Sequence, residues 1–193
     1  MNARGIVEGA TRLVRGVTCA LMRRRDATTP PERAQDVGSS PPEQEPDAIE
    51  ILIAEHRELD AWLTRVEQEP RSADTPALVD RIRTHLRAHV DAEEHTFYAH
   101  LREDIGNMGG LLDTSDGRHS TISQLLSVLE ETDPSDAPTV TRVVAALRYE
   151  FHDDVRLEEE SIFPQVRTAL TVEHLTALGR MLEQQRQSLL ASP

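Results

Sequence analysis

Four stretches between residues 47 and 170 carry apolar side chains at alternating steps of three and four residues. This spacing places the apolar side chains on one narrow face of an α-helix, so each helix needs neighbours that cover this face. The segments that join the stretches are short and rich in Pro, Gly, Ser and Asp. Four amphipathic helices with short connections predict an all-α fold, an antiparallel up-down four-helix bundle.

Start and stop signals give the expected bounds of these helices. Asp47 and Glu50 form a capping-box pattern, and Pro70 ends the first helix. An extra C-terminal helix is expected to pack on the outside of the bundle. The expected helices span about 47–69, 76–105, 114 or 115 to 132, 139–170 and, for the C-terminal helix, 173–190.

The chain before the bundle differs in composition. Residues 1–25 carry six arginines and one glutamate, a charge of +5, with apolar residues at helical spacing. This pattern predicts a basic amphipathic leader that contacts an anionic membrane or a partner; a frayed terminus without a binding role is the alternative. Residues 26–46 are rich in Pro, Ser and Glu and indicate a disordered linker. The four-helix bundle is expected to span residues 47–170. Residues 171–193 are expected to form the region of the C-terminal helix that packs on the bundle.

Composition also excludes several classes of protein. The net charge of −13 argues against a nucleic-acid-binding protein, which normally needs a basic face. The single Cys19 excludes an internal disulfide framework and a cysteine zinc site. No apolar run approaches the ~18 residues of a membrane-spanning helix. A cytoplasmic protein is expected, with peripheral membrane contact through residues 1–25 as an option, and no feature indicates an oligomeric state.

Six polar residues lie on the narrow apolar faces of these helices, called seams below. A bundle core is expected to be apolar at these positions. Buried charged groups normally pair with each other or bind metal. Residues four apart lie on the same face of a helix. One His from each of two helices and a four-spaced pair from each of the other two is a pattern that bundles use for two-metal sites. The predicted metal ligands are His56, His89, Glu93, His119, Asp154 and Glu158.

In the fourth helix, either His152 or Asp154 could be the inward residue one turn before Glu158. At about 100° per residue, His152 lies far around the helix from Asp154 and is expected to face solvent. Asp154 is the inward residue. The alternative is that Asp154 only accepts hydrogen bonds from the inward histidines, without metal.

Other polar residues near the seams receive structural interpretations. His85, one turn before His89, is an optional extra ligand, but a partly exposed position at the bundle end is preferred. Packing is the preferred role of Tyr98 and Tyr149, although either could donate a hydrogen bond to a bound ligand. A solvated face is expected for Glu94, Glu159 and Glu160, and surface positions for His95, His100 and His174.

At these residues the chain resembles the hemerythrin-like, or HHE cation-binding, family. The resemblance covers about residues 49–166 and rests on four segments, "IAEHREL", "HVDAEEHTFYAHL", "GRHSTISQLL" and "VRLEEESIFP". It implies a non-haem di-iron centre in a four-helix bundle, with a His on helices one and three and H-x-x-x-E on helices two and four. Family roles include oxygen binding, iron or oxygen sensing, and handling of nitric oxide or peroxide.

Carried over residue by residue, the resemblance implies the same six ligands, with Asp154 where the family has a histidine. It also implies that Glu93 and Glu158 bridge the metals. Ser123 stands where oxygen-carrying hemerythrins have a further histidine, so reversible oxygen carriage is not expected. Three histidines and three carboxylates make a harder donor set, which favours the carboxylate-rich di-iron or di-manganese type.

The expected function is that of a hemerythrin-like di-metal protein. Its cofactor is expected to be two non-haem iron ions, with manganese as an alternative. Its partners would be the metal ions and a small diatomic or peroxide ligand, so that it binds or senses oxygen, nitric oxide or peroxide, or sequesters iron. The competing hypothesis is a metal-free or degenerate helical bundle that acts as an interaction module.

Overall fold

The computed structural model describes residues 45–191, and all regular structure in this range is helical. The predicted leader and linker lie outside the described residues, apart from Glu45 and Pro46. The elements are α1 (Ala48–Gln68), α2 (Thr75–Ala92), the π-helical turn η1 (Glu93–Phe97), α3 (Tyr98–Asp104), α4 (Gly109–Glu131), α5 (Ala137–Leu157), the π-helical turn η2 (Glu158–Ile162), α6 (Phe163–Ala169) and α7 (Val172–Ala191).

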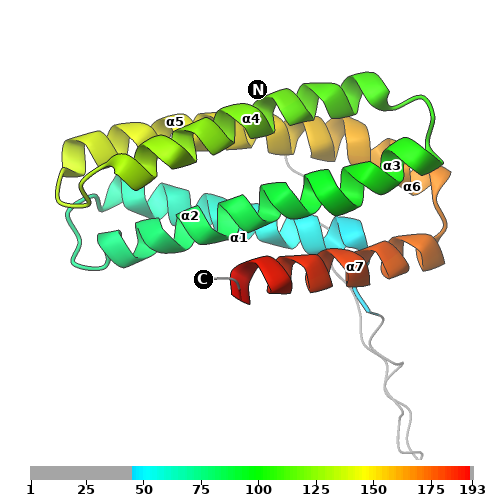
Figure 1. The fold of residues 1–193 in the computed structure, drawn as a ribbon, viewed down its shortest axis with the longest axis horizontal. Helices are drawn as coiled ribbons and strands as arrows, with labels where there is room; N and C mark the ends of the chain where they lie inside the picture. Colours follow the sequence, from blue (N-terminus) through cyan, green and yellow to red (C-terminus); the bar gives the residue numbers. More distant parts are fainter. Residues whose placement is uncertain (1–44, 192–193) are drawn as a thin grey trace, which may run out of the picture. The chain divides into compact units, whose positions relative to one another are not determined.

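Four long helices form the bundle, because α2 continues through η1 into α3 and α5 continues through η2 into α6. Successive helices run in opposite directions, and α1 packs against α2 and α5 while α4 packs against α5 and α2 (Figure 1). The additional helix α7 runs along the outside of the bundle against α1 and α2. The predicted all-α, up-down four-helix bundle with an extra C-terminal helix is therefore confirmed.

The helix starts show where local signals decide and where packing decides. At α1 the predicted capping box is present: Asp47 accepts from the Glu50 N–H at 2.9 Å, and the Asp47 N–H donates to Glu50 at 3.0 Å. The predicted start of the third helix, near 114, is wrong, because α4 begins at Gly109. Met108 and Leu112 are fully buried there, so core packing overrides the low helix propensity of the glycines.

The buried residues form two apolar clusters with a polar layer between them. One cluster contains Ile49 and Leu52 near the start of α1, and the other contains Leu59 and Leu63 in the two turns beyond His56. The order is the same along α4 and reversed along α2 and α5, which run in the opposite direction. The buried polar side chains of this layer are His56, His89, Glu93, Ser115, His119, Asp154 and Glu158.

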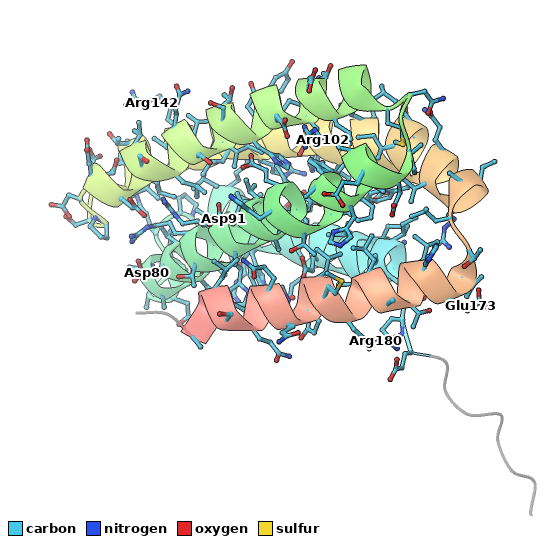
Figure 2. All side chains as sticks on the ribbon, turned by 45° about the vertical axis from the view of Figure 1, so that its right-hand side comes forward. Asp80, Asp91, Arg102, Arg142, Glu173 and Arg180 are labelled. Carbon is cyan, nitrogen blue, oxygen red and sulfur yellow. The ribbon has the colours of Figure 1, made fainter. Side chains whose placement is uncertain are left out.

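The outer faces of the helices are charged. Asp80, Arg142 and Glu173 are exposed, and side chains project from the bundle surface on all sides (Figure 2). None of the helices between residues 45 and 191 is long and apolar enough to cross a membrane. The membrane contact predicted for residues 1–25 concerns residues outside this range.

Candidate metal centre

Two π-helical turns begin at the two predicted bridging glutamates. In η1 the N–H of Tyr98 donates to the carbonyl of Glu93, and in η2 the N–H of Phe163 donates to that of Glu158. Each turn holds one residue more than an α-helical turn, so the inward face moves by one residue. π-helical turns inside α-helices are frequent at functional sites. Both helices were predicted to be regular α-helices, so these turns were not expected.

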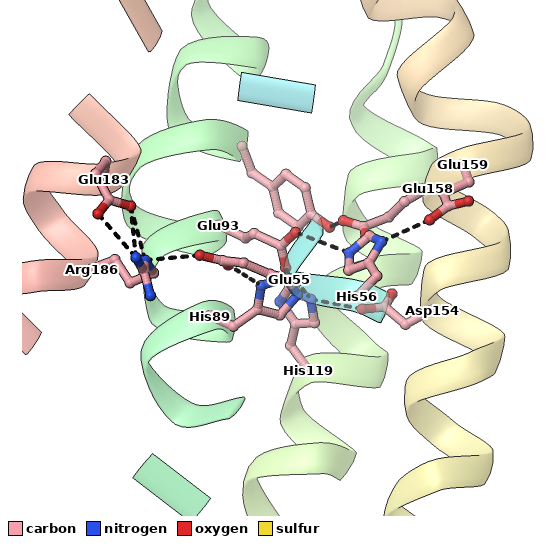
Figure 3. Close-up of polar contacts among 11 residues, drawn as sticks. Glu55, His56, His89, Glu93, His119, Asp154, Glu158, Glu159, Glu183 and Arg186 are labelled. Carbon is pink, nitrogen blue, oxygen red and sulfur yellow. Dashed lines mark hydrogen bonds and ion pairs between the residues drawn. The ribbon is translucent and has the colours of Figure 1, made fainter. Parts of the chain in front are cut away.

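The first group of donor atoms comes from α1, the end of α2 and the start of η1. Figure 3 shows His56 and His89 turned toward Glu93. Nε2 of His89 lies 3.3 Å from Oε2 of Glu93, and Nε2 of His56 lies 3.9 Å from Oε1. Each of the three residues offers a ligand atom within 4.8 Å of the others, and all three are buried. This group has the size of one metal position.

The second group adds α4, α5 and η2. Nε2 of His119 lies 2.8 Å from Oδ2 of Asp154 and 3.4 Å from Oε2 of Glu93. Glu93, His119, Asp154 and Glu158 offer ligand atoms within 4.8 Å of one another, and all four are buried. Glu93 thus belongs to both groups. Glu158 also reaches the first group, since its Oε2 lies 3.1 Å from Nε2 of His56.

Burial and mutual charge set the protonation of this cluster. Burial opposes the charged form of His56, but Glu158 and Glu93 outweigh it and raise its pKa well above the usual value. The pKa values of His89 and His119 are raised in the same way by nearby carboxylates. Burial and the charge of Glu93 raise the pKa of Glu158 to about 7, whereas the histidines overcome burial and lower the pKa of Glu93. The raised histidine pKa values favour ion pairs between these histidines and the carboxylates of the cluster.

A carboxylate lies close to Nδ1 of each of the three histidines, on the ring edge that faces away from the other donor atoms. Nδ1 of His89 lies 2.8 Å from Oε2 of Glu55, and Nδ1 of His56 lies 3.0 Å from Oε1 of Glu159. Oε1 of Glu94 lies 3.3 Å from Nδ1 of His119. Such partners fix the tautomer and orientation of metal-binding histidines and leave Nε2 for the metal.

This arrangement corrects part of the sequence analysis. Glu94 and Glu159 are partly solvent-exposed, as the predicted solvated face requires, but both carboxylates also contact histidine rings of the cluster, which was not predicted. Glu55 is missed altogether. Glu94 and Glu159 each follow a predicted bridging glutamate directly, and this repeated "EE" pair is the signal that could have found them.

A buried hydroxyl network links the second group to α3. The Tyr98 hydroxyl donates to Oε1 of Glu158 and lies 2.8 Å from Oγ of Ser115. Ser115 in turn donates to Oδ1 of Asp154 at 2.5 Å. The Tyr98 ring stacks on His119 with ring centroids 5.5 Å apart. Tyr98 therefore packs as expected and also orients two carboxylates, whereas Tyr149 is 66% exposed.

Two further histidines that were considered as ligands from the sequence, His152 and His85, lie away from the cluster. His152 is 49% exposed and its Nε2 lies 2.5 Å from Oδ1 of Asp60, so it faces outward as predicted. His85 packs edge-on against Trp62, with centroids 5.0 Å apart, and belongs to neither donor group. The structure thus brings the six predicted side chains together and keeps His152 and His85 out.

A cavity of about 760 Å³ lies between α1 and α5 and reaches the cluster. His56 and Glu159 line it, together with Arg57, Arg148 and Arg156. Because His56 is otherwise buried, the cavity brings solvent-accessible space to the first donor group.

The buried donor atoms fit a metal better than they fit one another. Among residues 45–191, Nε2 of His56 and of His119, both carboxylate oxygens of Glu93 and Oε2 of Glu158 lie close to oppositely charged groups but make no hydrogen bond. Unpaired buried polar atoms are costly and rare in native structures. These atoms converge on two adjacent positions, and His nitrogen and carboxylate oxygen are suitable ligands for iron or manganese.

The comparisons with known proteins agree with this geometry. A family model described as the hemerythrin HHE cation binding domain matches residues 44–166. This range contains all six clustered donor residues and ends before α7. No curated protein and no solved structure was found to match the chain.

Proposed function

Because the chain belongs to the hemerythrin HHE cation-binding family, we propose that it holds two non-haem iron ions and acts on a small diatomic or peroxide ligand. One ion would be held by His56, His89 and Glu93. The other would be held by His119, Asp154 and Glu158, with Glu93 shared between the ions. Manganese suits the same donors, since half of them are carboxylates.

The observation that carries this proposal is the position of Glu93. It is fully buried, both its oxygens lack hydrogen-bond partners, and it belongs to both donor groups. A carboxylate in that position serves two cations at once. The contact of Glu158 with His56 supports a second bridge.

The donor set favours redox chemistry over reversible oxygen carriage. When bound, a pair of non-haem iron ions supplies open coordination positions and electron transfer to small oxygen or nitrogen species. Asp154 contributes an anionic oxygen donor where the family pattern has a neutral histidine. Anionic oxygen donors favour the higher oxidation states of iron. The protein's own part is to fix the ligands through Glu55, Glu94, Glu159 and Tyr98, and to admit the small ligand beside His56.

Anaerobic titration of the metal-free protein with Fe²⁺, followed by metal analysis, tests the proposal. About two irons per chain are expected, together with visible absorption that changes when oxygen, nitric oxide or hydrogen peroxide is added. Glu93→Ala should lose both ions, because it removes the shared ligand. Glu160→Ala, at an exposed position of the other π-helical turn, η2, removes a glutamate outside both donor groups; it is the control and should bind like the wild type. Binding of one iron per chain or fewer in the wild type would contradict the proposal.

A further inference from the structure

The C-terminal helix sends one side chain toward the metal centre. Nε of Arg186 on α7 lies 2.8 Å from Oε1 of Glu55, and the other oxygen of Glu55 lies 2.8 Å from Nδ1 of His89. Figure 3 shows this chain of contacts running from α7 to the cluster. α7 lies beyond residue 166, where the family match ends.

Glu55 differs from the two other carboxylates that stand behind histidines. Its side chain is 15% exposed, against 34% for Glu94 and 37% for Glu159. Of these three carboxylates, only Glu55 contacts an arginine within the described residues. Glu94 and Glu159 are each more than a third exposed, so water can reach their second oxygens, whereas Glu55 is more enclosed. The second oxygen of Glu55 forms an ion pair with Arg186 and makes no hydrogen bond within the described residues.

Arg186 is itself held in place from two sides. Glu183, one turn earlier on α7, accepts from the Arg186 guanidinium at 2.8 and 3.0 Å. The helix is anchored by the buried Leu175, Leu178 and Leu182. At Gly179 the two backbones approach so closely that a Cβ atom would lie 2.9 Å from the Ala48 nitrogen. The position of Arg186 therefore depends on how α7 seats on α1.

We propose that Arg186 is a positioning residue of the metal centre. By holding Glu55, it fixes the ring plane and the Nδ1–H tautomer of His89, so that Nε2 of His89 faces the position shared with His56 and Glu93. Seating of α7 thereby controls the occupancy of one of the two metal positions. The inference rests on the proposed function.

Its effect is predicted to be selective for one position. His119 and Asp154 are oriented by Glu94 and Ser115, without α7. Loss of a partner behind a metal-binding histidine typically lowers metal affinity 10–100-fold. Arg186→Leu should therefore lower the affinity for one of the two Fe²⁺ ions by about 10–100-fold and leave the affinity for the other unchanged.

The test is anaerobic Fe²⁺ titration of the full-length wild type, Arg186→Leu, Arg186→Lys and Arg180→Leu. Arg186→Lys retains a cation for Glu55 and should restore part of the affinity. Arg180 pairs with the exposed Glu45 on the outside of the same helix, so Arg180→Leu is the matched control and should bind both ions like the wild type. In the metal-free protein, the ¹⁵N chemical shift of Nδ1 of His89 should change in Arg186→Leu but not in Arg180→Leu, because of the two arginines only Arg186 contacts the carboxylate beside that nitrogen.

The outcomes separate this inference from the proposed function. Two ions bound with wild-type affinity by Arg186→Leu would overturn the inference and leave the proposed function standing. Equal weakening of both ions would also overturn it, since that indicates general destabilisation. A wild-type protein that binds no iron would overturn both. Selective loss of one ion, partial rescue by Arg186→Lys and an altered His89 signal would support it.

Discussion

Removal of the Tyr98 hydroxyl should destabilise the protein through the polar layer alone. Tyr98 is fully buried, donates to Glu158 and contacts Ser115. Tyr98→Phe keeps the ring and its stacking on His119, so no cavity forms. It leaves one oxygen of Glu158 without its donor.

The size of the effect follows from the charge of the acceptor. A hydrogen bond to a charged group contributes about 1.5–3 kcal/mol. For a protein of this size each kcal/mol corresponds to about 2–4 °C in Tm, so Tm should fall by roughly 3–12 °C. The loss should be larger at pH 8 than at pH 6, because the Glu158 pKa is about 7 and only the ionised carboxylate gives the stronger bond.

Urea unfolding and thermal melting of the metal-free protein at both pH values measure this effect. Tyr149→Phe is the matched control: its side chain is 66% exposed, and its unfolding free energy should change by less than about 0.5 kcal/mol. Equal stabilities for the two variants would refute the reasoning, because they would show that the Tyr98 hydroxyl does not hold Glu158.

Three further predictions follow from the same contacts. Folding raises the pKa values of Glu158 and of the site histidines, so the folded metal-free protein binds more protons than the unfolded chain. Its free energy of unfolding, measured by urea titration, should therefore fall from about pH 6 to 8. Excess Fe²⁺ should reverse this pH dependence, because the metal displaces those protons. Asp154→Asn should lower the affinity for one Fe²⁺ ion at least about tenfold, measured by isothermal titration calorimetry. Asp153→Asn, at the neighbouring outward position, should leave both affinities unchanged. Gly179→Ala should lower the free energy of unfolding by about 1–3 kcal/mol through the clash with α1, whereas Gly117→Ala, with open space around it, should raise it by roughly 0.5–1 kcal/mol.

Local and periodic signals made most of the fold predictable. The Asp47 capping box and the seam spacing sufficed for α1, and the four-residue spacing of His89 and Glu93 placed both on one inward face. The same periodicity explains why His152 could be assigned to the outside. Each of these features depends on residues within one or two helical turns.

Features that depend on distant residues escaped prediction. The π-helical turns replace i+4 hydrogen bonds with i+5 bonds. The hydrophobic pattern before them shows no break, so the one-residue shift of the inward face after Glu93 and Glu158 was not foreseen. Glu55 and Arg186 are 131 positions apart in the chain numbering and meet only because α7 packs on α1. Seam periodicity identifies which residues point inward but not which outer side chains brace them.

Anomalous diffraction at the iron edge, from crystals of the iron-reconstituted protein, would locate the bound ions. Two iron peaks are expected, one beside His56 and His89 and one beside His119 and Asp154, with the Glu93 carboxylate between them. A single peak, or peaks outside this cluster, would contradict the proposed function.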